Sequence, residues 1–291
     1  MTSFFSRPAV RSALAATVLA AGATVASAEA GTRVIERAPY ESQLDGLTVA
    51  FLARDLQTGV DHVLAGSDLD SRHTPWSTFK IPNFLIAIET GAAPSPEAWR
   101  DWNPERRPAE AYWPEAWRQG QTLGTAFARS AAWYFQDLAL EIGTETYREK
   151  LSDWGYGNAD VPPDSDDFWL SGSLRISVRE QVDFLAALVS DELDLSDRSR
   201  RALDAASLAG AAPGITLHGK TGSGPDDPDD VDGAFSGWYA GYLQREGRAP
   251  VVFALHVSAP SFTQLRDFRK SFSITLLEAS GLVPRGALAN R

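Results

Sequence analysis

The sequence predicts an α/β protein of the α+β type, in which a mainly antiparallel sheet is interrupted by an all-helical subdomain. Three observations support this prediction. Strand-like patterns occur towards both ends of the chain, at residues 46–66 and after residue 214. Between them, residues 92–210 are mainly helical in pattern, with apolar side chains three and four positions apart. An amphipathic helix at residues 262–280 closes the chain.

The first 28 residues have the features of a secretion signal. Arg7 and Arg11 form a positive start, residues 12–25 are apolar, and Ala26-Ser27-Ala28 is a small-residue cleavage site. A membrane anchor is the alternative, but the apolar run is shorter than the ~20 residues that a span needs. We therefore expect a mature chain, residues 29–291, that forms one domain and has no membrane partner.

Composition narrows the possible partners of this domain. The chain has no cysteine, and 44% of its residues are hydrophobic, so an ordinary apolar core must stabilise it. A net charge of −11 argues against nucleic acid and anionic membranes as partners. The four histidines are scattered without the spacing of metal ligands, so we expect no metal site.

The strands are expected on either side of the helical region. Residues 47–52 and 62–64 read as a hairpin with a turn at Thr58-Gly59. Three later strands, rich in aromatic and β-branched residues, are expected at residues 215–217, 234–243 and 250–257. We assign residues 29–70 and 211–291 to the sheet subdomain, and residues 71–210 to the helical subdomain.

Within the helical region, an apolar helix opens at Ser77 and ends at Gly91. Residues 121–142 and 177–195 also have helical periodicity. Proline- and aspartate-rich stretches at residues 94–108 and 160–167 are expected to be loops.

One lysine stands out because lysine is rare here, with four lysines against 23 arginines. Lys80 follows Ser77 by three residues, so the amine and the hydroxyl lie on one face of a helix. A desolvated lysine can lose its proton, which arginine cannot do near neutral pH. The pair is therefore a candidate activated serine nucleophile. The Ser-x-x-Lys spacing alone is weak evidence and needs partners elsewhere.

Two further motifs supply candidate partners. Lys220-Thr221-Gly222 ends a predicted strand, where a cation and a hydroxyl can hold a substrate carboxylate and glycine permits close approach. The alternative interpretation of Lys220-Thr221-Gly222 is an edge strand followed by a turn, with no role in binding. Ser130 lies near the start of a helical segment, and its hydroxyl can relay a proton to a leaving nitrogen or simply cap a helix.

The order Ser-x-x-Lys, Ser-x-x, Lys-Thr-Gly is that of penicillin-recognising serine transferases and hydrolases. From about Gly46 to Val283 the chain resembles the class D, oxacillinase-type β-lactamases. Class A enzymes would carry Ser-Asp-Asn where this chain has Ser130-Ala131-Ala132, and no Gly-x-Ser-x-Gly elbow of an α/β-hydrolase occurs. The segments that carry the resemblance are residues 77–83, Tyr156-Gly157-Asn158, Phe168-Trp169-Leu170, Leu174-Arg175-Ile176-Ser177 and Phe268-Arg269-Lys270-Ser271.

The resemblance implies a sheet flanked by N- and C-terminal helices, and hydrolysis of penicillin-type antibiotics through an acyl-enzyme on Ser77, giving resistance. It also implies that Lys80 takes up CO2 from bicarbonate, becomes an Nζ-carbamate and acts as the general base, with no other cofactor. An apolar pocket would keep the lysine neutral enough to react. Trp169 is expected to donate a hydrogen bond to the resulting anion.

Further roles follow from the same resemblance. Ser130 and Lys220 would pass a proton to the lactam nitrogen, and the amides of Ser77 and Ser223 would form the oxyanion hole. Thr221, Gly222, Ser223 and Arg269 would hold the substrate, with the Arg269 fork on its carboxylate. Arg266, one turn earlier, reads as a surface charge.

Two positions depart from the family pattern. Ala132 stands where the family usually has valine, which weakens the apolar shielding expected beside the carbamate. Trp76 is bulkier than the residue expected before the nucleophile, and either narrows the pocket or packs inward.

An alternative function is a penicillin-binding sensor or transpeptidase-like protein that is acylated but deacylates slowly. A sensor normally carries membrane spans, and a related transpeptidase would favour asparagine at position 132. The expected location is the periplasm of a Gram-negative bacterium, and the sequence carries no indication of oligomeric state.

Overall fold

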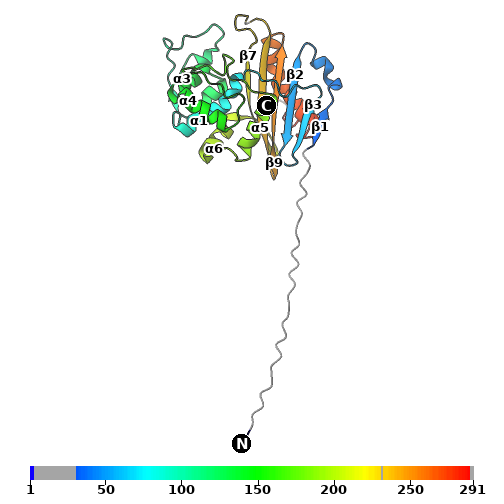
Figure 1. Ribbon diagram of the computed structural model, residues 1–291. Coiled ribbons are helices and arrows are strands. Elements are labelled where there is room, and N and C mark those ends of the chain that lie inside the picture. Colours follow the sequence, from blue (N-terminus) through cyan, green and yellow to red (C-terminus); the bar gives the residue numbers. More distant parts are fainter. Residues whose placement is uncertain (3–30, 231, 289–291) are drawn as a thin grey trace.

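The computed structural model describes residues 1–2, 31–230 and 232–288 of the chain. All but the first two residues of the predicted secretion signal lie outside the described residues. A central sheet separates a group of helices on one side from a single long helix on the other (Figure 1).

The sheet has seven strands in the order β1-β3-β2-β9-β8-β7-β6. Neighbouring strands are antiparallel except for β1, which runs parallel to β3. The strand bounds are β1 Thr32–Ile35, β2 Thr48–Asp55, β3 Val60–Leu64, β6 Leu208–Ala212, β7 Ile215–Pro225, β8 Phe235–Arg245 and β9 Arg248–Ala259, and a separate ribbon pairs β4 Trp99–Arg100 with β5 Gln121–Thr122.

Local sequence explains where the helices begin and end. The α-helices are α1 Lys80–Thr90, α2 Leu123–Arg129, α3 Ala132–Ile142, α4 Thr144–Asp153, α5 Val178–Val189, α6 Asp197–Ser207 and α7 Phe262–Ala279, and the 3₁₀ helices are η1 Ala38–Gln43, η2 Trp76–Phe79 and η3 Glu115–Trp117. Helix α1 ends at Gly91, whose φ of 81° suits glycine. Helix α5 begins with a capping box between Ser177 and Glu180.

The predicted hairpin, the three later strands and the closing helix are all present. Several details differ. Strand β7 continues to Pro225, so Lys220-Thr221-Gly222 lies within the strand and not at its end. The helical pattern of residues 121–142 is divided, because Gln121 and Thr122 pair with β4 and the chain turns at Ser130. Helix α5 ends at Val189, short of the predicted residue 195. The N-terminal helix flanking the sheet is the short η1.

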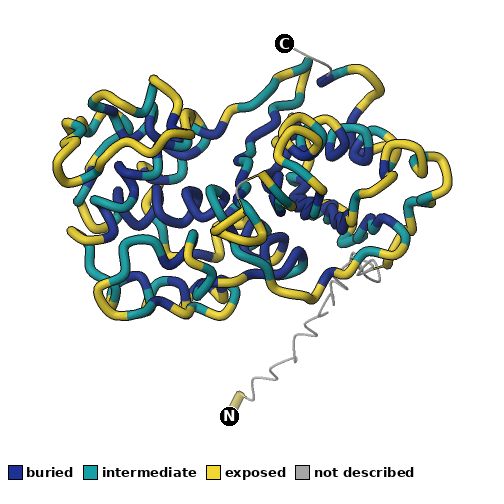
Figure 2. The backbone as a smooth tube through the Cα atoms, turned by 90° about the horizontal axis from the view of Figure 1, so that it is seen from above, coloured by how far each residue is buried: buried dark blue, intermediate teal, exposed yellow. Residues whose placement is uncertain are grey.

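Two apolar cores lie on opposite faces of the sheet. One joins α1–α6 to one sheet face, and the other packs α7 and η1 against the other face. Figure 2 shows the buried stretches of these two halves in dark blue. Segment η2, which carries Ser77, contacts β7 and β8 where the helical part meets the sheet. Among the described residues, no helix is long and apolar enough to span a membrane.

Candidate active site

The serine–lysine pair meets as its spacing predicts. Ser77 lies in η2, and Lys80 is the first residue of α1. The Nζ atom of Lys80 donates a hydrogen bond of 3.0 Å to the Oγ atom of Ser77. A hydroxyl that contacts an amine in this way is positioned to lose its proton when it attacks.

The surroundings of Lys80 disfavour its charged form. Its side chain is fully buried, and its amine lies 5.2 Å from the centre of the Phe135 ring. No carboxylate among the described residues forms an ion pair with it, and it lies at the positive end of α1. Burial lowers the pKa of Lys80 to about 7. A large share of this amine is therefore neutral near pH 7.

Ser130 occupies a turn between two helices. It caps the C-terminus of α2 with a left-handed φ of 58°, and α3 starts two residues later. Two indoles brace this turn: Trp117 Nε1 donates to the Arg129 carbonyl at 2.7 Å, and Trp133 Nε1 donates to the Trp117 carbonyl at 2.8 Å. Neither tryptophan is singled out by its sequence context, although the need of the buried Trp133 indole N–H for an acceptor is a general signal.

Lys220 links Ser130 to the sheet. Its Nζ atom donates to the Ser130 Oγ and, at 3.0 Å, to the carbonyl of Thr221. Burial lowers the pKa of Lys220 well below its usual value, and the charges of Lys80 and Arg269 lower it further. Three basic side chains thus gather here, and none of them pairs with a carboxylate of the described residues. Such a site favours an anionic ligand.

Arg269 approaches the same strand from α7. Its Nη1 donates to the Gly222 carbonyl at 3.2 Å, while its buried Nε has no partner among the described residues. Burial lowers its pKa to about 10. Arg266 is exposed and pairs with Asp267 at 3.3 Å, as expected of a surface charge. Arg269, and not Arg266, is therefore placed to receive an anion beside β7.

Gly222 allows β7 to lie directly against the nucleophile. A Cβ atom on Gly222 would lie 2.9 Å from the backbone nitrogens of Ser77 and Thr78, and 2.8 Å from the Pro75 carbonyl. Real Cβ atoms are not found this close, so only glycine fits. The backbone of η2 and the strand that carries Thr221 and Ser223 are consequently in contact.

The indole N–H of Trp169 is a buried donor without an acceptor among the described residues. The Trp169 ring is fully buried and stacks on Phe79, with ring centres 5.2 Å apart. A buried donor without an acceptor is costly, so this atom suits an added anionic group. With the partly neutral Lys80, it fits the carbamate expected from the sequence.

The Tyr156-Gly157-Asn158 element holds the loop that carries Trp169. Asn158 donates to the Ser173 carbonyl at 2.8 Å and accepts from the Arg175 amide at 2.9 Å. Gly157 has a φ of 58°, and a Cβ there would lie 2.1 Å from the Arg175 carbonyl oxygen. This element therefore fixes the loop backbone.

Comparison with known proteins places this arrangement in a family. Residues 50–196 match the penicillin binding protein transpeptidase domain. The chain is 32% identical to the probable β-lactamase YbxI of Bacillus subtilis over 80% of its own length and 81% of that protein. It superposes on the class D β-lactamase of Sebaldella termitidis with a TM-score of 0.78 and 27% identity, covering 87% of this chain and 99% of that one.

The chain belongs to the class D β-lactamases. It is accordingly a serine hydrolase of that family. The same fold occurs in the C-terminal domain of the Bacillus licheniformis BlaR penicillin receptor, with a TM-score of 0.77, 24% identity and coverage of 88% of this chain and 99% of that one.

The structure shows what surrounds the two residues at which this β-lactamase departs from its family pattern. Ala132 is the first residue of α3 and is half-buried, and Phe135, one turn later, turns its ring to the Lys80 amine. Trp76 packs inward, with its indole against Gly224 and its Nε1 donating to Ser236 Oγ at 3.3 Å. Of the two interpretations of Trp76, the structure supports inward packing.

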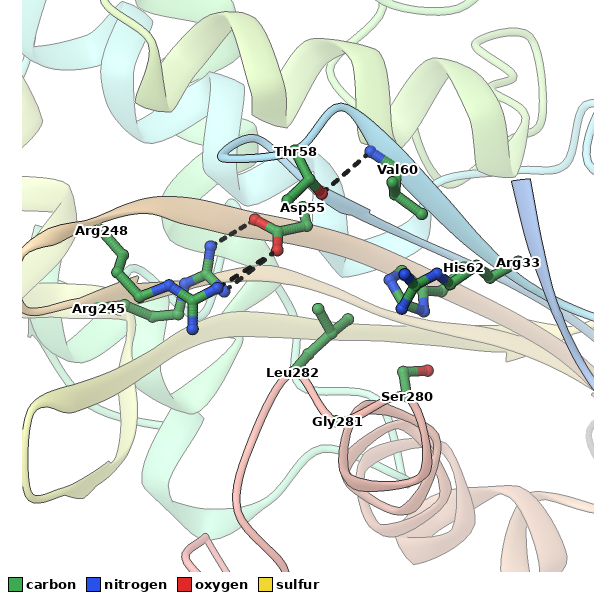
Figure 3. Close-up of a pocket in the computed structure, with 10 residues that line it drawn as sticks. All are labelled: Arg33, Asp55, Thr58, Val60, His62, Arg245, Arg248, Ser280, Gly281 and Leu282. Carbon is green, nitrogen blue, oxygen red and sulfur yellow. Dashed lines mark hydrogen bonds and ion pairs between the residues drawn. The ribbon is translucent and has the colours of Figure 1, made fainter. Parts of the chain in front are cut away.

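A hollow of about 290 Å³ lies at the other end of this β-lactamase's sheet (Figure 3). None of the predicted site residues lines it. Two of its basic side chains, Arg245 and Arg248, pair with the buried Asp55 carboxylate, and Arg245 Nη2 lies 2.5 Å from Asp55 Oδ1. Arg245 pairs with Ile215, five residues before Lys220 on β7, so roughly 17 Å separates it from that lysine along the strand.

Proposed function

We propose that this class D β-lactamase opens the lactam ring of penicillin-type antibiotics through an acyl-enzyme on Ser77. The observation that carries the proposal is the 3.0 Å contact between Lys80 Nζ and Ser77 Oγ at a fully buried lysine without an acidic partner among the described residues. A nucleophile beside a base with a strongly shifted pKa is characteristic of catalytic sites.

In the acylation step, Ser77 Oγ bonds to the lactam carbonyl carbon and the ring C–N bond breaks. The backbone amides of Ser77 and Ser223 would donate to the carbonyl oxygen as it becomes negative, each such donor typically contributing ~3 kcal/mol. The leaving nitrogen receives its proton from Ser130, which is replenished through its hydrogen bond from Lys220. Arg269 and Thr221 would hold the substrate carboxylate.

Deacylation requires a base for water. A carbamate on Lys80 would supply an anionic proton acceptor, both for the Ser77 hydroxyl and for the attacking water. The chain's own part is to keep the Lys80 amine buried and partly neutral, and to present the free indole N–H of Trp169. Water then gives its hydroxyl to the acyl carbon, and Ser77 recovers its proton.

Carboxylation can be tested apart from turnover. In ¹³C-bicarbonate, the protein should show one carbamate resonance in NMR that is absent from Lys80→Met. Trp169→Phe keeps the ring but loses the N–H, so it should need roughly tenfold more bicarbonate for the same signal. A wild-type spectrum without this resonance would leave the neutral amine as the base.

The reaction itself is tested by intact mass of residues 29–291 during incubation with benzylpenicillin and bicarbonate. A penicilloyl adduct should form and disappear, and it should be absent from Ser77→Ala. An adduct that persists for hours would instead support the alternative, a penicillin-binding sensor or transpeptidase-like protein that deacylates slowly. No adduct at all would refute the proposed function.

Residues 1–28 are part of the same proposal, as a signal for export to the periplasm of a Gram-negative host. Expression of the full chain in a susceptible strain should raise the inhibitory concentration of benzylpenicillin, whereas residues 29–291 alone should not. Equal resistance from both would refute the export role.

A further inference from the structure

Trp76, directly before the nucleophile, has an unusual backbone. Its φ is 50°, in the left-handed region that bulky residues rarely adopt. Strained residues persist only where the surrounding contacts hold them. Contacts of the Trp76 indole are therefore candidates for holding this backbone conformation.

The indole is held by two neighbouring strands. A Cβ on Gly224 of β7 would lie 2.3–2.5 Å from three carbon atoms of the Trp76 ring, so the ring lies flat against that glycine. Ser236 of β8, which accepts from Nε1 at 3.3 Å, is the register partner of Gly224. Trp76 thus contacts both strands at one point of the sheet.

This contact lies next to the proposed oxyanion hole. The two donors come from different elements: the Ser77 amide follows Trp76 in η2, and the Ser223 amide precedes Gly224 in β7. Other bonds hold this segment elsewhere: Trp238 donates to the carbonyl of Thr74, two residues before η2, and Gln181 donates to Thr78 Oγ1 within η2, each at 2.9 Å. The Trp76 ring lies against β7 one residue beyond Ser223.

We infer that Trp76 is a positioning residue. Its indole, packed against Gly224 and bonded to Ser236, keeps the Ser77 and Ser223 amides at a fixed distance from each other. The inference rests on the proposed function, because it concerns the oxyanion hole of that reaction. Trp76 itself touches no reacting atom. Removing the Trp76 indole should therefore weaken the binding of the tetrahedral intermediate, formed when Ser77 attacks the carbonyl, more than the binding of intact substrate.

The test compares Trp76→Ala with wild type by rate constants and by a tetrahedral analogue. Acylation and deacylation by benzylpenicillin should each slow about tenfold or more, and the affinity for phenylboronic acid should fall by a similar factor. Binding of intact benzylpenicillin, measured in a Ser77→Ala background, should change less than threefold. Bicarbonate dependence should stay as in wild type, which separates the effect from one on Lys80.

Gly224→Ala gives the decisive comparison, because its methyl group would displace the ring. It should slow the wild-type enzyme and have little further effect in Trp76→Ala, a non-additivity expected only of contacting residues. Ser236→Ala should give a smaller loss. Trp154→Phe, at a buried tryptophan directly after α4, is the control and should leave the rates unchanged.

If Trp76→Ala does not fold, Gly224→Ala and Ser236→Ala decide the question. Rates and boronate affinity within twofold of wild type in the folded variants would overturn the inference while leaving the proposed function intact. A wild-type chain that forms no adduct would instead overturn both.

Discussion

A buried basic side chain lies near each end of the β7–β8 pair, but only one of the two is paired with a carboxylate. At the far end, the Arg245 guanidinium pairs with the buried Asp55 carboxylate (Figure 3). It also donates to the Ala249 carbonyl. At the near end, the Lys80 amine is fully buried, and within the described part of the chain its only hydrogen-bond partner is the Ser77 hydroxyl.

The difference shows why one buried basic group stabilises the fold whereas the other is suited to catalysis. Burial by itself raises the pKa of Asp55, but the hydrogen bonds from Arg245 and from the Gln57 amide outweigh it, and the pKa is lowered. The Asp55 carboxylate is therefore held in its charged form. Lys80 has no such compensation, so its pKa falls to about 7 and its amine becomes reactive. A buried basic group without a carboxylate therefore marks the active end of the sheet.

The largest effect should come from Lys80→Met, which keeps the volume but removes the amine. We expect kcat/KM for benzylpenicillin to fall at least ~1,000-fold, because the base is lost. In bicarbonate-free buffer at pH 7 the variant should be more stable than wild type, because the buried Lys80 must give up part of its proton on folding and methionine removes that cost. Lys270→Met, at a lysine of α7 that donates to the Ala209 carbonyl, is the control and should retain activity. Equal losses in both variants would contradict the comparison.

Asp55→Ala should show the opposite behaviour at the far end. Removing the carboxylate leaves Arg245 buried without its anion, which should lower the free energy of unfolding by about 3–5 kcal/mol. Urea unfolding measures this loss, and kcat of the folded enzyme at low temperature should stay within twofold of wild type. Arg248→Ala, 3.8 Å from Asp55 and half-exposed, should cost less than about 1 kcal/mol. A large fall in kcat for Asp55→Ala would mean that the two ends are coupled.

The pH dependence of stability should distinguish the wild-type protein from Lys80→Met. The pKa of Lys80 is lowered from 10.5 to about 7 on folding, so above pH 7 the unfolded chain binds the extra proton. In bicarbonate-free buffer, the free energy of unfolding should therefore rise with pH between about 7 and 10 by up to ~1.4 kcal/mol per pH unit, and this contribution is lost as the pH falls towards 7. Lys80→Met should lack this slope. The same slope in both proteins would show that Lys80 keeps its proton when folded.

The smallest effect is expected from Ala132→Val. Valine at the start of α3 would add apolar shielding beside the Lys80 amine, next to that already given by Phe135. We expect the bicarbonate concentration that gives half-maximal activity to fall by a few-fold, with little change in maximal kcat. An unchanged bicarbonate requirement would remove the argument that Ala132 weakens the site.

Some elements were predictable because their causes are local. The i, i+3 spacing of Ser77 and Lys80, the glycine that ends α1, and the alternation and aromatic content of the strands act over a few residues. The break at Ser130 was missed because its causes are not local. Its left-handed turn is braced by Trp117 and Trp133, and the pairing of β4 with β5 removes residues 121–122 from the helix.

The order of the motifs, the division into strands and helices, and the contact between the Ser77 hydroxyl and the Lys80 amine all follow from the chain read residue by residue. Which distant groups share the site depends instead on how the elements pack together. Lys220 reaches Ser130 across 90 residues, and Arg245 pairs with Asp55 across 190. Whether a buried cation receives a carboxylate depends on how strands and helices pack around it. Residue spacing carries no information about that packing, because it reports only neighbours along one element.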